Sequence, residues 1–311
     1  MEIQNINNLL RKLREDNTSG ANEFIDKVLE IIQFQLNLIH DPQKDIKEEI
    51  LSLSKQIIDA RPSMAPLINT IGYFISNLEI FNKNIMEERL IQFNYDRERR
   101  TESLGLIFHI FLEENERVPL KIMLISYSST IINLLLKNKE FNYEIYVLES
   151  RPLLEGQRAA EILSPHFKTH LLIDAAIGTS IDEIELVLVG VDSILKDGSI
   201  INKIGTFPLA LLANTRKIDV YAVCDSFKYN LKSHYGRSIS ITEKPISEVY
   251  NKEITNKFLE VHNYYFDITP PEYISGIISE LGVLSITEFL EKVKKALPME
   301  WFKYFINNIE V

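Results

Sequence analysis

The stretch "IELVLVGVDSILKDGSIINKIGTFPLALLANTRKIDVYAVCDS", residues 184–226, decides the fold class. It begins with a run of Val and Leu that is typical of a strand buried on both faces. A connector rich in turn-forming residues follows, and an apolar helical segment comes next at 207–216. A second strand-like run closes the stretch at 218–226. A strand, a helix and another strand in this order indicate a parallel sheet covered by helices.

Strand-like and helix-like segments alternate on both sides of this stretch. Upstream, short apolar runs at 119–126, 143–150 and 169–176 are expected to be strands, with helices between them. Downstream, the segments 272–284 and 286–297 are expected to be helices. The chain therefore carries several strand–helix units after its first third, and these predict an α/β domain with a parallel sheet.

The segment 226–265 is polar, irregular and long for a loop. Loops of this length in compact domains usually serve a function or a contact. The segment is rich in Tyr and Phe, and aromatic residues are favoured at interfaces. We therefore expect it to wrap around the surface or around an adjoining subunit, and we expect a homodimer or a higher homo-oligomer.

The first part of the chain has a different hydrophobic periodicity. Glycines are few, and apolar residues such as Ile50 and Ile57 recur at helical spacing. The segment 84–112 reads as one long helix or two abutting helices. The change from helical spacing to alternating strands and helices after this segment predicts two domains. They are a helical domain at residues 1–115 and an α/β domain at residues 116–311.

Composition excludes several classes of protein. The 311 residues carry 44 acidic and 34 basic side chains, a net charge of −10, which argues against a general nucleic-acid binder. The single cysteine, Cys224, can form no intrachain disulfide and suits a reducing compartment. No run approaches the roughly 18 apolar residues of a membrane helix, and the N-terminus lacks the apolar core of a signal peptide. We expect a cytoplasmic protein that does not contact a membrane.

Polar side chains follow the predicted strands at the edge where open α/β sheets bind ligands. Arg151 and Arg158 follow the second strand, Asp174 the third and Asp192 the fourth. Because the carboxyl ends of parallel strands meet at one edge, these side chains should converge there. Guanidinium groups bind phosphate oxygens in a bidentate manner, so this edge suits a small polar anion.

The connector "DGSIINKIGT" at 197–206 allows two interpretations. In one, Asn202 and Lys203 join the backbone N–H groups of Gly205 and Thr206 at a helix start to bind an anion. In the other, the connector is an ordinary turn, Asn202 braces it and Lys203 is a surface lysine. The sequence leaves both open.

Asp192 is the candidate proton carrier, because a carboxylate at a partly buried strand tip can have a raised pKa. By its position alone, a role as a cap or turn residue is the more common one. Cys224 lies in a predicted buried strand and is expected to be a packing residue. His166 and His170 are four residues apart, but Pro165 and a strand interrupt the helix that zinc binding at this spacing would need.

Neither a metal nor a cofactor is expected. No G-x-G-x-x-G fingerprint follows a predicted strand, and no phosphate-binding loop is present. The nucleophile elbow G-x-S-x-G is missing as well.

Four segments together resemble one superfamily. They are "ESRPLLEGQRAAEIL", "LVLVGVDSILKDGSIINKIGTFPLAL", "YAVCDSFK" and "FDITPPEYISGIISELGVL". This superfamily comprises the regulatory alpha, beta and delta subunits of initiation factor two B and the isomerases of ribose 1,5-bisphosphate and methylthioribose 1-phosphate. The resemblance covers roughly residues 118–290 well and the helical half more loosely. It implies a helical domain, a Rossmann-like domain and a dimer formed through the latter.

The resemblance also implies roles for individual residues. The isomerases carry a catalytic aspartate at the position of Asp192 and a catalytic cysteine just after the first strand, where this chain has Tyr127. A phenol holds its proton more tightly than a thiol does, and the ring is bulkier. Aldose–ketose isomerisation needs both an acid and a base, so the replacement puts catalysis in doubt.

Five residues match positions that hold or border the sugar phosphate in this superfamily: Arg61 in "ARPSMAPL", Arg151, Arg158, Asn202 and Lys203. We therefore favour a non-catalytic regulatory subunit that keeps a pocket for a phosphorylated sugar or nucleotide, with initiation factor two as a candidate partner. The alternative is an aldose–ketose isomerase of the ribose 1,5-bisphosphate isomerase type, in which Asp192 acts with a second, unrecognised group.

Overall fold

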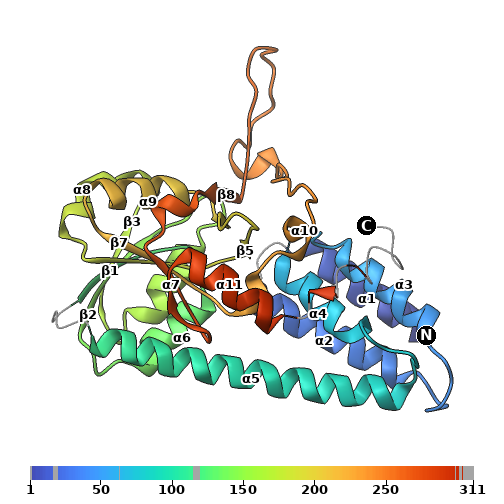
Figure 1. Cartoon of the computed structure of the whole chain (residues 1–311). Helices are drawn as coiled ribbons and strands as arrows, with labels where there is room; N and C mark the ends of the chain where they lie inside the picture. Colours follow the sequence, from blue (N-terminus) through green and yellow to red (C-terminus); the bar gives the residue numbers. More distant parts are fainter. Residues whose placement is uncertain are drawn as a thin grey trace.

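A computed structural model describes residues 2–16, 20–62, 64–114, 120–297, 299–300 and 303 of the 311. A helical half and an α/β half lie side by side, and the long helix α5 (Lys83–Glu113) runs along both (Figure 1). The helical half also contains α1 (Glu2–Glu15), α2 (Ala21–Asn37), α3 (Lys47–Ile58) and α4 (Ala65–Ile75). The fold class expected from the sequence, helices followed by a parallel-sheet α/β unit, is confirmed.

Helix α5 belongs to two hydrophobic cores. Met86 and Phe93 in its first half pack in one core, and Leu104 and Phe108 in its second half pack in the other. The Asn82 side chain caps the start of the helix by accepting a hydrogen bond of 3.0 Å from the Ile85 N–H. The segment that allowed one or two helices thus forms a single helix, and it spans both halves of the molecule.

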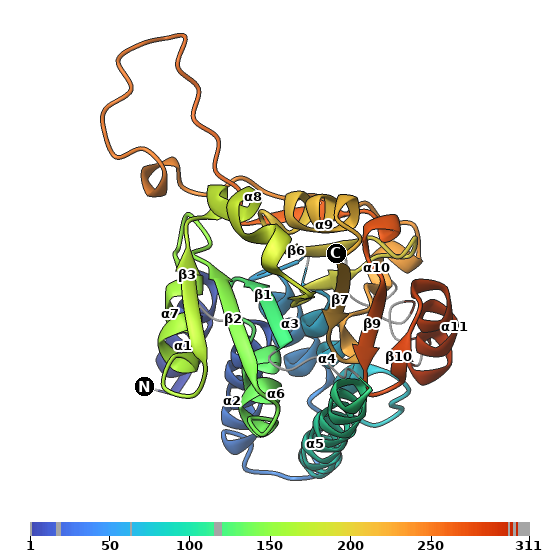
Figure 2. The same ribbon diagram turned by 90° about the vertical axis from the view of Figure 1, so that its left-hand side faces the viewer.

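The described residues form a seven-stranded sheet with the order β10-β9-β7-β4-β1-β2-β3, in which all neighbours but β10 and β9 are parallel. Its strands are β1 (Leu120–Ile125), β2 (Tyr143–Leu148), β3 (Lys168–Leu172), β4 (Leu186–Val189), β7 (Asp219–Val223), β9 (Gly276–Ser279) and β10 (Gly282–Leu284). Its connecting helices are α6 (Ser129–Lys137), α7 (Glu155–Leu163), α8 (Ile177–Ser180) and α9 (Thr206–Thr215). Figure 2 shows α5 and α6 on the side of the sheet opposite to α8 and α9.

Successive strand residues enter different cores because side chains alternate between the two faces of a sheet. In β1, Ile122 and Leu124 pack with α6 and the second half of α5. Met123 and Ile125 instead join the core that contains the helices of the N-terminal half and α9. The helical half and one face of the sheet therefore share one hydrophobic core, which fixes the position of one against the other.

The prediction of a helix at 272–284 is wrong, because this segment forms the antiparallel hairpin of β9 and β10. Gly282 has φ +126° in the turn, a conformation that other residues rarely adopt. A side chain at Gly276 would come within 2.9 Å of the carbonyl oxygen of Leu284. The following helix, α11 (Ile286–Ala296), forms as expected and begins with a capping box of Ser285 and Glu288.

The connector after β4 folds into a structure that the sequence did not predict. Residues expected to extend the fourth strand as far as Asp192 instead leave the sheet, and β5 (Ser193–Ile194) and β6 (Ile200–Lys203) form a hairpin. Gly198 supplies the turn with φ +90°. Strand β8 (Phe266–Thr269) pairs with β6 and completes a small second sheet.

The segment between β7 and β8 is irregular, as expected, apart from short helical turns that include α10 (Leu231–His234). Part of it projects far from the rest of the molecule (Figures 1 and 2). Phe258 in this segment is 84% exposed. None of the described helices combines the length and the apolar composition that crossing a membrane requires.

The start of α9 is capped by a carboxylate from the second sheet. One oxygen of Asp267 accepts hydrogen bonds from the N–H groups of Gly205 and Phe207, at 2.8 and 3.2 Å. Its burial raises the pKa of Asp267 to about 6, although these bonds favour the charged form. The ionised Asp267 carboxylate at the start of α9 therefore costs the folded protein free energy.

We expect Asp267→Asn to change how stability depends on pH. The pKa of Asp267 in the folded protein, about 6, lies above the value of about 3.9 in an unfolded chain. The wild type therefore loses stability as the pH rises from about 4 through 6, and the variant lacks this loss. The free energy of unfolding of the variant relative to the wild type should rise by up to about 3 kcal/mol over this range.

Urea unfolding at a series of pH values measures this difference. The exposed Asp219→Asn is the matched control and should run parallel to the wild type. A difference between Asp267→Asn and the wild type that stays constant with pH would contradict the expected titration.

Candidate functional site

A cavity of about 380 Å³ lies between the helical half and the carboxyl end of the sheet. Loops after β1 and β4 form part of its wall, together with strand β6 and residues 238–242 of the irregular segment. Six cationic side chains line it, namely Arg14, Arg61, Lys203, Lys228, Lys232 and Lys244. Three carboxylates line it as well, namely Asp16, Glu155 and Asp192.

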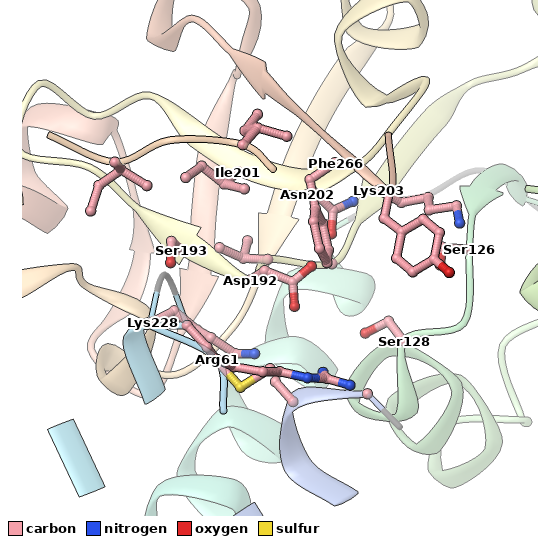
Figure 3. Close-up of a pocket in the computed structure, with 18 of the residues that line it drawn as sticks. Arg61, Ser126, Ser128, Asp192, Ser193, Ile201, Asn202, Lys203, Lys228 and Phe266 are labelled. Atoms are coloured by element: carbon pink, nitrogen blue, oxygen red, sulfur yellow. The ribbon is translucent and has the colours of Figure 1, made fainter. Parts of the chain in front are cut away.

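Asp192 lies at the centre of this group (Figure 3). Its backbone N–H donates to the carbonyl oxygen of Ile201 at 2.9 Å, so the β5–β6 hairpin fixes its position. Its carboxylate keeps some surface on the cavity, but protein surrounds it elsewhere, and this burial raises its pKa. The positive charges of Lys228, Arg61 and Lys203 act in the opposite direction and favour the carboxylate.

Arg61 is positioned by the N-terminal helices. Its guanidinium stacks on the ring of Phe24, 4.3 Å from the centroid, and donates to the backbone oxygen of Asp16. Burial lowers its pKa from the usual range, against the attraction of Asp16 and Asp192. The helical half thus supplies a buried positive charge to a site at the end of the sheet.

Lysines from the segments after β7 add to this charge. Lys228 belongs to the turn Ser226–Lys228, and Lys232 lies in α10. Burial lowers the pKa of Lys232. The pKa of Lys244 is lowered by burial and also by the positive charge of Arg61. Cations that disfavour one another's charge inside a cavity would gain from an anion bound between them.

Lys203 differs from the other cavity lysines because it forms an ion pair with a carboxylate. Its ammonium lies 2.8 Å from an oxygen of Glu155, the first residue of α7, and 5.4 Å from the ring centroid of Tyr265. The Lys203 side chain is only 4% exposed. Lys203 is therefore no surface lysine, and its charge is balanced within the protein.

Asn202 braces the connector, as one of the two interpretations expected. Its amide donates to the hydroxyl of Thr206 at 3.0 Å, and that hydroxyl donates to the carbonyl oxygen of Lys203 at 2.6 Å. The expectation that the N–H groups of Gly205 and Thr206 bind an anion is wrong, because Asp267 already occupies the start of α9. The side chains of Asn202 and Lys203 nevertheless line the cavity.

Tyr127 also lines the cavity, but two predicted arginines do not. Arg158 is exposed, lies 4.0 Å above the ring of Tyr127 and pairs with Glu23 at 3.1 Å. Arg151 is exposed, and its backbone N–H is held by a carboxylate oxygen of Asp174 at 2.7 Å. The structure thus brings Arg61, Tyr127, Asp192, Asn202 and Lys203 together and leaves Arg151 and Arg158 outside the cavity wall.

The sequence analysis missed several lining residues. Lys228 could have been found, because it follows β7 at the sheet edge where the other candidates were sought. Lys244 and Tyr265 lie in the segment that was read only as irregular, and no local pattern marked them. They reach the cavity because the chain folds back on itself.

Cys224 is 1% exposed, and burial raises its pKa. It packs in the core shared by the sheet and the helical half. Among the described residues, no three or more His, Cys, Asp or Glu side chains gather closely enough to hold a metal ion. The six cationic side chains of the cavity wall are suited to an anion.

Similar proteins fall into two functional groups. Ribose 1,5-bisphosphate isomerase of Methanocaldococcus jannaschii is 27% identical over 254 residues, which cover 81% of this chain and 82% of that protein. A putative translation initiation factor eIF-2B subunit 2-like protein of Pyrococcus horikoshii is 26% identical over 281 residues, covering 89% of this chain and 95% of the relative.

A solved structure with the same fold is the translation initiation factor eIF-2B of Pyrococcus horikoshii OT3. It superposes with a TM-score of 0.76 at 24% sequence identity and covers 90% of this chain and 97% of its own. A sequence model of the initiation factor 2 subunit family matches residues 1–286. The match runs from the helical half through the cavity residues to the last strand of the sheet. The chain belongs to the initiation factor 2 subunit family.

Proposed function

We propose that this protein is a non-catalytic regulatory subunit of the eIF-2B type that binds a phosphorylated sugar or nucleotide. The observation that carries the proposal is the cluster of Arg61, Lys228, Lys232 and Lys244 on the wall of the cavity. A phosphate bound among them would offset the burial and the repulsion from Arg61 that together lower the pKa of Lys244. The volume of about 380 Å³ is at the lower end of the range for small-molecule sites and suits a sugar phosphate.

The chemistry of the cavity wall supports binding without turnover. Isomerisation of a sugar moves a proton between adjacent carbons and needs an acid and a base on the substrate. Tyr127 stands where the isomerases that the sequence resembles carry a cysteine, and the Arg158 guanidinium covers its ring. Cys224 is the only cysteine of the chain, and it is buried in the core.

Assembly with other proteins is part of this proposal. A regulatory subunit acts through partners, and we expect a second copy of this chain and initiation factor two among them. The projecting segment between β7 and β8 supports a role in assembly, because it extends away from the cores and exposes Phe258.

One observation favours the alternative of a sugar-phosphate isomerase. Burial raises the pKa of Asp192, and a raised pKa favours a role as a proton donor and acceptor. A relative 27% identical to this chain is named ribose 1,5-bisphosphate isomerase. In this alternative Asp192 would act as the acid–base group, with a second group still to be found.

We expect Lys228→Gln to weaken the binding of sugar phosphates. The variant loses one charge that faces Asp192 and the cavity while keeping a side chain of similar length. Loss of a hydrogen bond to a charged group corresponds to about 10- to 100-fold weaker binding. Isothermal titration calorimetry with ribose 1,5-bisphosphate and ribose 5-phosphate measures the effect. The exposed Lys139→Gln is the matched control and should bind as the wild type does, whereas equal affinity in all three proteins would refute a phosphate site at this cluster.

We expect purified wild-type protein to form no ribulose 1,5-bisphosphate from ribose 1,5-bisphosphate. Its product level should equal that of Asp192→Asn, in which an amide that takes up no proton replaces the carboxylate. Product formation followed by ³¹P NMR provides the test. Turnover by the wild type that disappears in Asp192→Asn and persists in Tyr127→Phe would overturn the non-catalytic role and establish the isomerase.

A further inference from the structure

The charges on the cavity wall are unevenly compensated. Arg61 and Lys228 approach Asp192 from one side, and Asn202 and Lys203 approach it from the other (Figure 3). Of the cavity lysines, Lys203 alone lies at hydrogen-bonding distance from a described carboxylate, the Glu155 oxygen at 2.8 Å. The wall formed by Lys203 and Glu155 therefore carries no net charge. On the opposite wall Arg61 also pairs with Asp16 at 3.9 Å, but the further charges of Lys228, Lys232 and Lys244 leave that wall positive.

The second carboxylate oxygen of Glu155 is an unsatisfied hydrogen-bond acceptor. This Oε2 atom is buried and has no hydrogen-bond partner among the described residues. A buried acceptor without a donor is costly and uncommon in folded proteins. Glu155 lines the cavity and its side chain is 22% exposed, so a ligand can supply the missing donor once the carboxylate turns toward it.

A hydroxyl group can meet this requirement, but a phosphate dianion cannot. The hydroxyl donates its hydrogen to a carboxylate, whereas the dianion has no hydrogen to donate and is repelled by the negative charge. Two donors near Lys203 are engaged within the protein. The amide of Asn202 donates to Thr206, and the phenol of Tyr265 donates to Glu248 at 2.6 Å.

We propose that Glu155 makes this cavity selective for sugars with one phosphate, by neutralising Lys203 and offering an acceptor to a sugar hydroxyl. The inference rests on the proposed function and narrows its ligand class. The single phosphate binds on the wall around Arg61 and Lys228, and a free hydroxyl faces Glu155. A second phosphate at the far end of the sugar meets the Glu155 carboxylate and gains nothing from Lys203.

The variant Glu155→Gln tests this assignment. It retains an oxygen acceptor for the hydroxyl but leaves the buried Lys203 ammonium without a counter-charge. A second phosphate can then take the place of the lost carboxylate. We expect the affinity for ribose 1,5-bisphosphate to rise at least about tenfold, as a new charge-assisted hydrogen bond would give. The affinity for ribose 5-phosphate and ribose 1-phosphate should change less than about threefold, since neither places a phosphate at this wall.

Two further variants serve as controls in the same calorimetric titrations. Glu102→Gln removes an exposed carboxylate of α5, outside the cavity wall, and should bind all three sugars as the wild type does. The double variant Glu155→Gln/Lys203→Met removes both members of the pair, so the gain for the bisphosphate should disappear. If Glu155→Gln is unstable without a ligand, the rise in melting temperature with bisphosphate against monophosphate gives the same comparison.

The outcomes separate this inference from the proposed function. Wild-type protein that binds no phosphorylated sugar would refute both. Wild-type protein that binds ribose 1,5-bisphosphate tighter than both monophosphates would leave the phosphate site in place and overturn the selectivity. A gain in Glu155→Gln that is equal for all three sugars, or one that persists in the double variant, would also overturn it.

Discussion

The site depends on how helix α4 is anchored against the loops at the end of the sheet. The buried amide of Asn69 donates to the carbonyl oxygens of Phe227 and Tyr229, at 2.7 and 2.9 Å, on either side of Lys228. The N–H of Ala65 at the start of α4 donates to the hydroxyl of Ser193, the neighbour of Asp192. One helix of the N-terminal half therefore holds the backbone next to both charges at the centre of the cavity.

This anchoring explains why a sheet edge can hold so many like charges. Arg61 directly precedes the segment that leads into α4, and its stacking on Phe24 ties it to α2. Each cation is placed by a different element, and the packing of the shared core supplies the free energy that holds them close together. The cations of the cavity thus disfavour one another's charge, and an anion bound between them would offset this repulsion.

The sequence was informative where a local pattern decides the structure. Continuous Val and Leu runs predicted the parallel strands, and polar residues after them predicted the ligand edge. The hairpin at 272–284 was missed because adjacent Ile residues between glycines fit a buried helix and a buried strand equally well. The Glu155–Lys203 pair was missed because its members are 48 residues apart and belong to separate crossovers. Lys244 and Tyr265 join the site only through the tertiary course of an irregular segment.

Tyr127 stands where the isomerases that the sequence resembles carry a cysteine, and it also affects where Arg158 lies. Its ring offers Arg158 a stacking surface at 4.0 Å, and Glu23 of α2 holds the same guanidinium at 3.1 Å. A cysteine at this position would offer no such surface, and Glu23 alone would then hold the arginine. A single aromatic ring therefore stands where the isomerases that the sequence resembles carry a cysteine, and it helps to hold a nearby positive charge outside the wall. The cations around Arg61 depend on neither Tyr127 nor Arg158. A protein of this fold can therefore keep a binding site for an anion without the groups that catalysis needs.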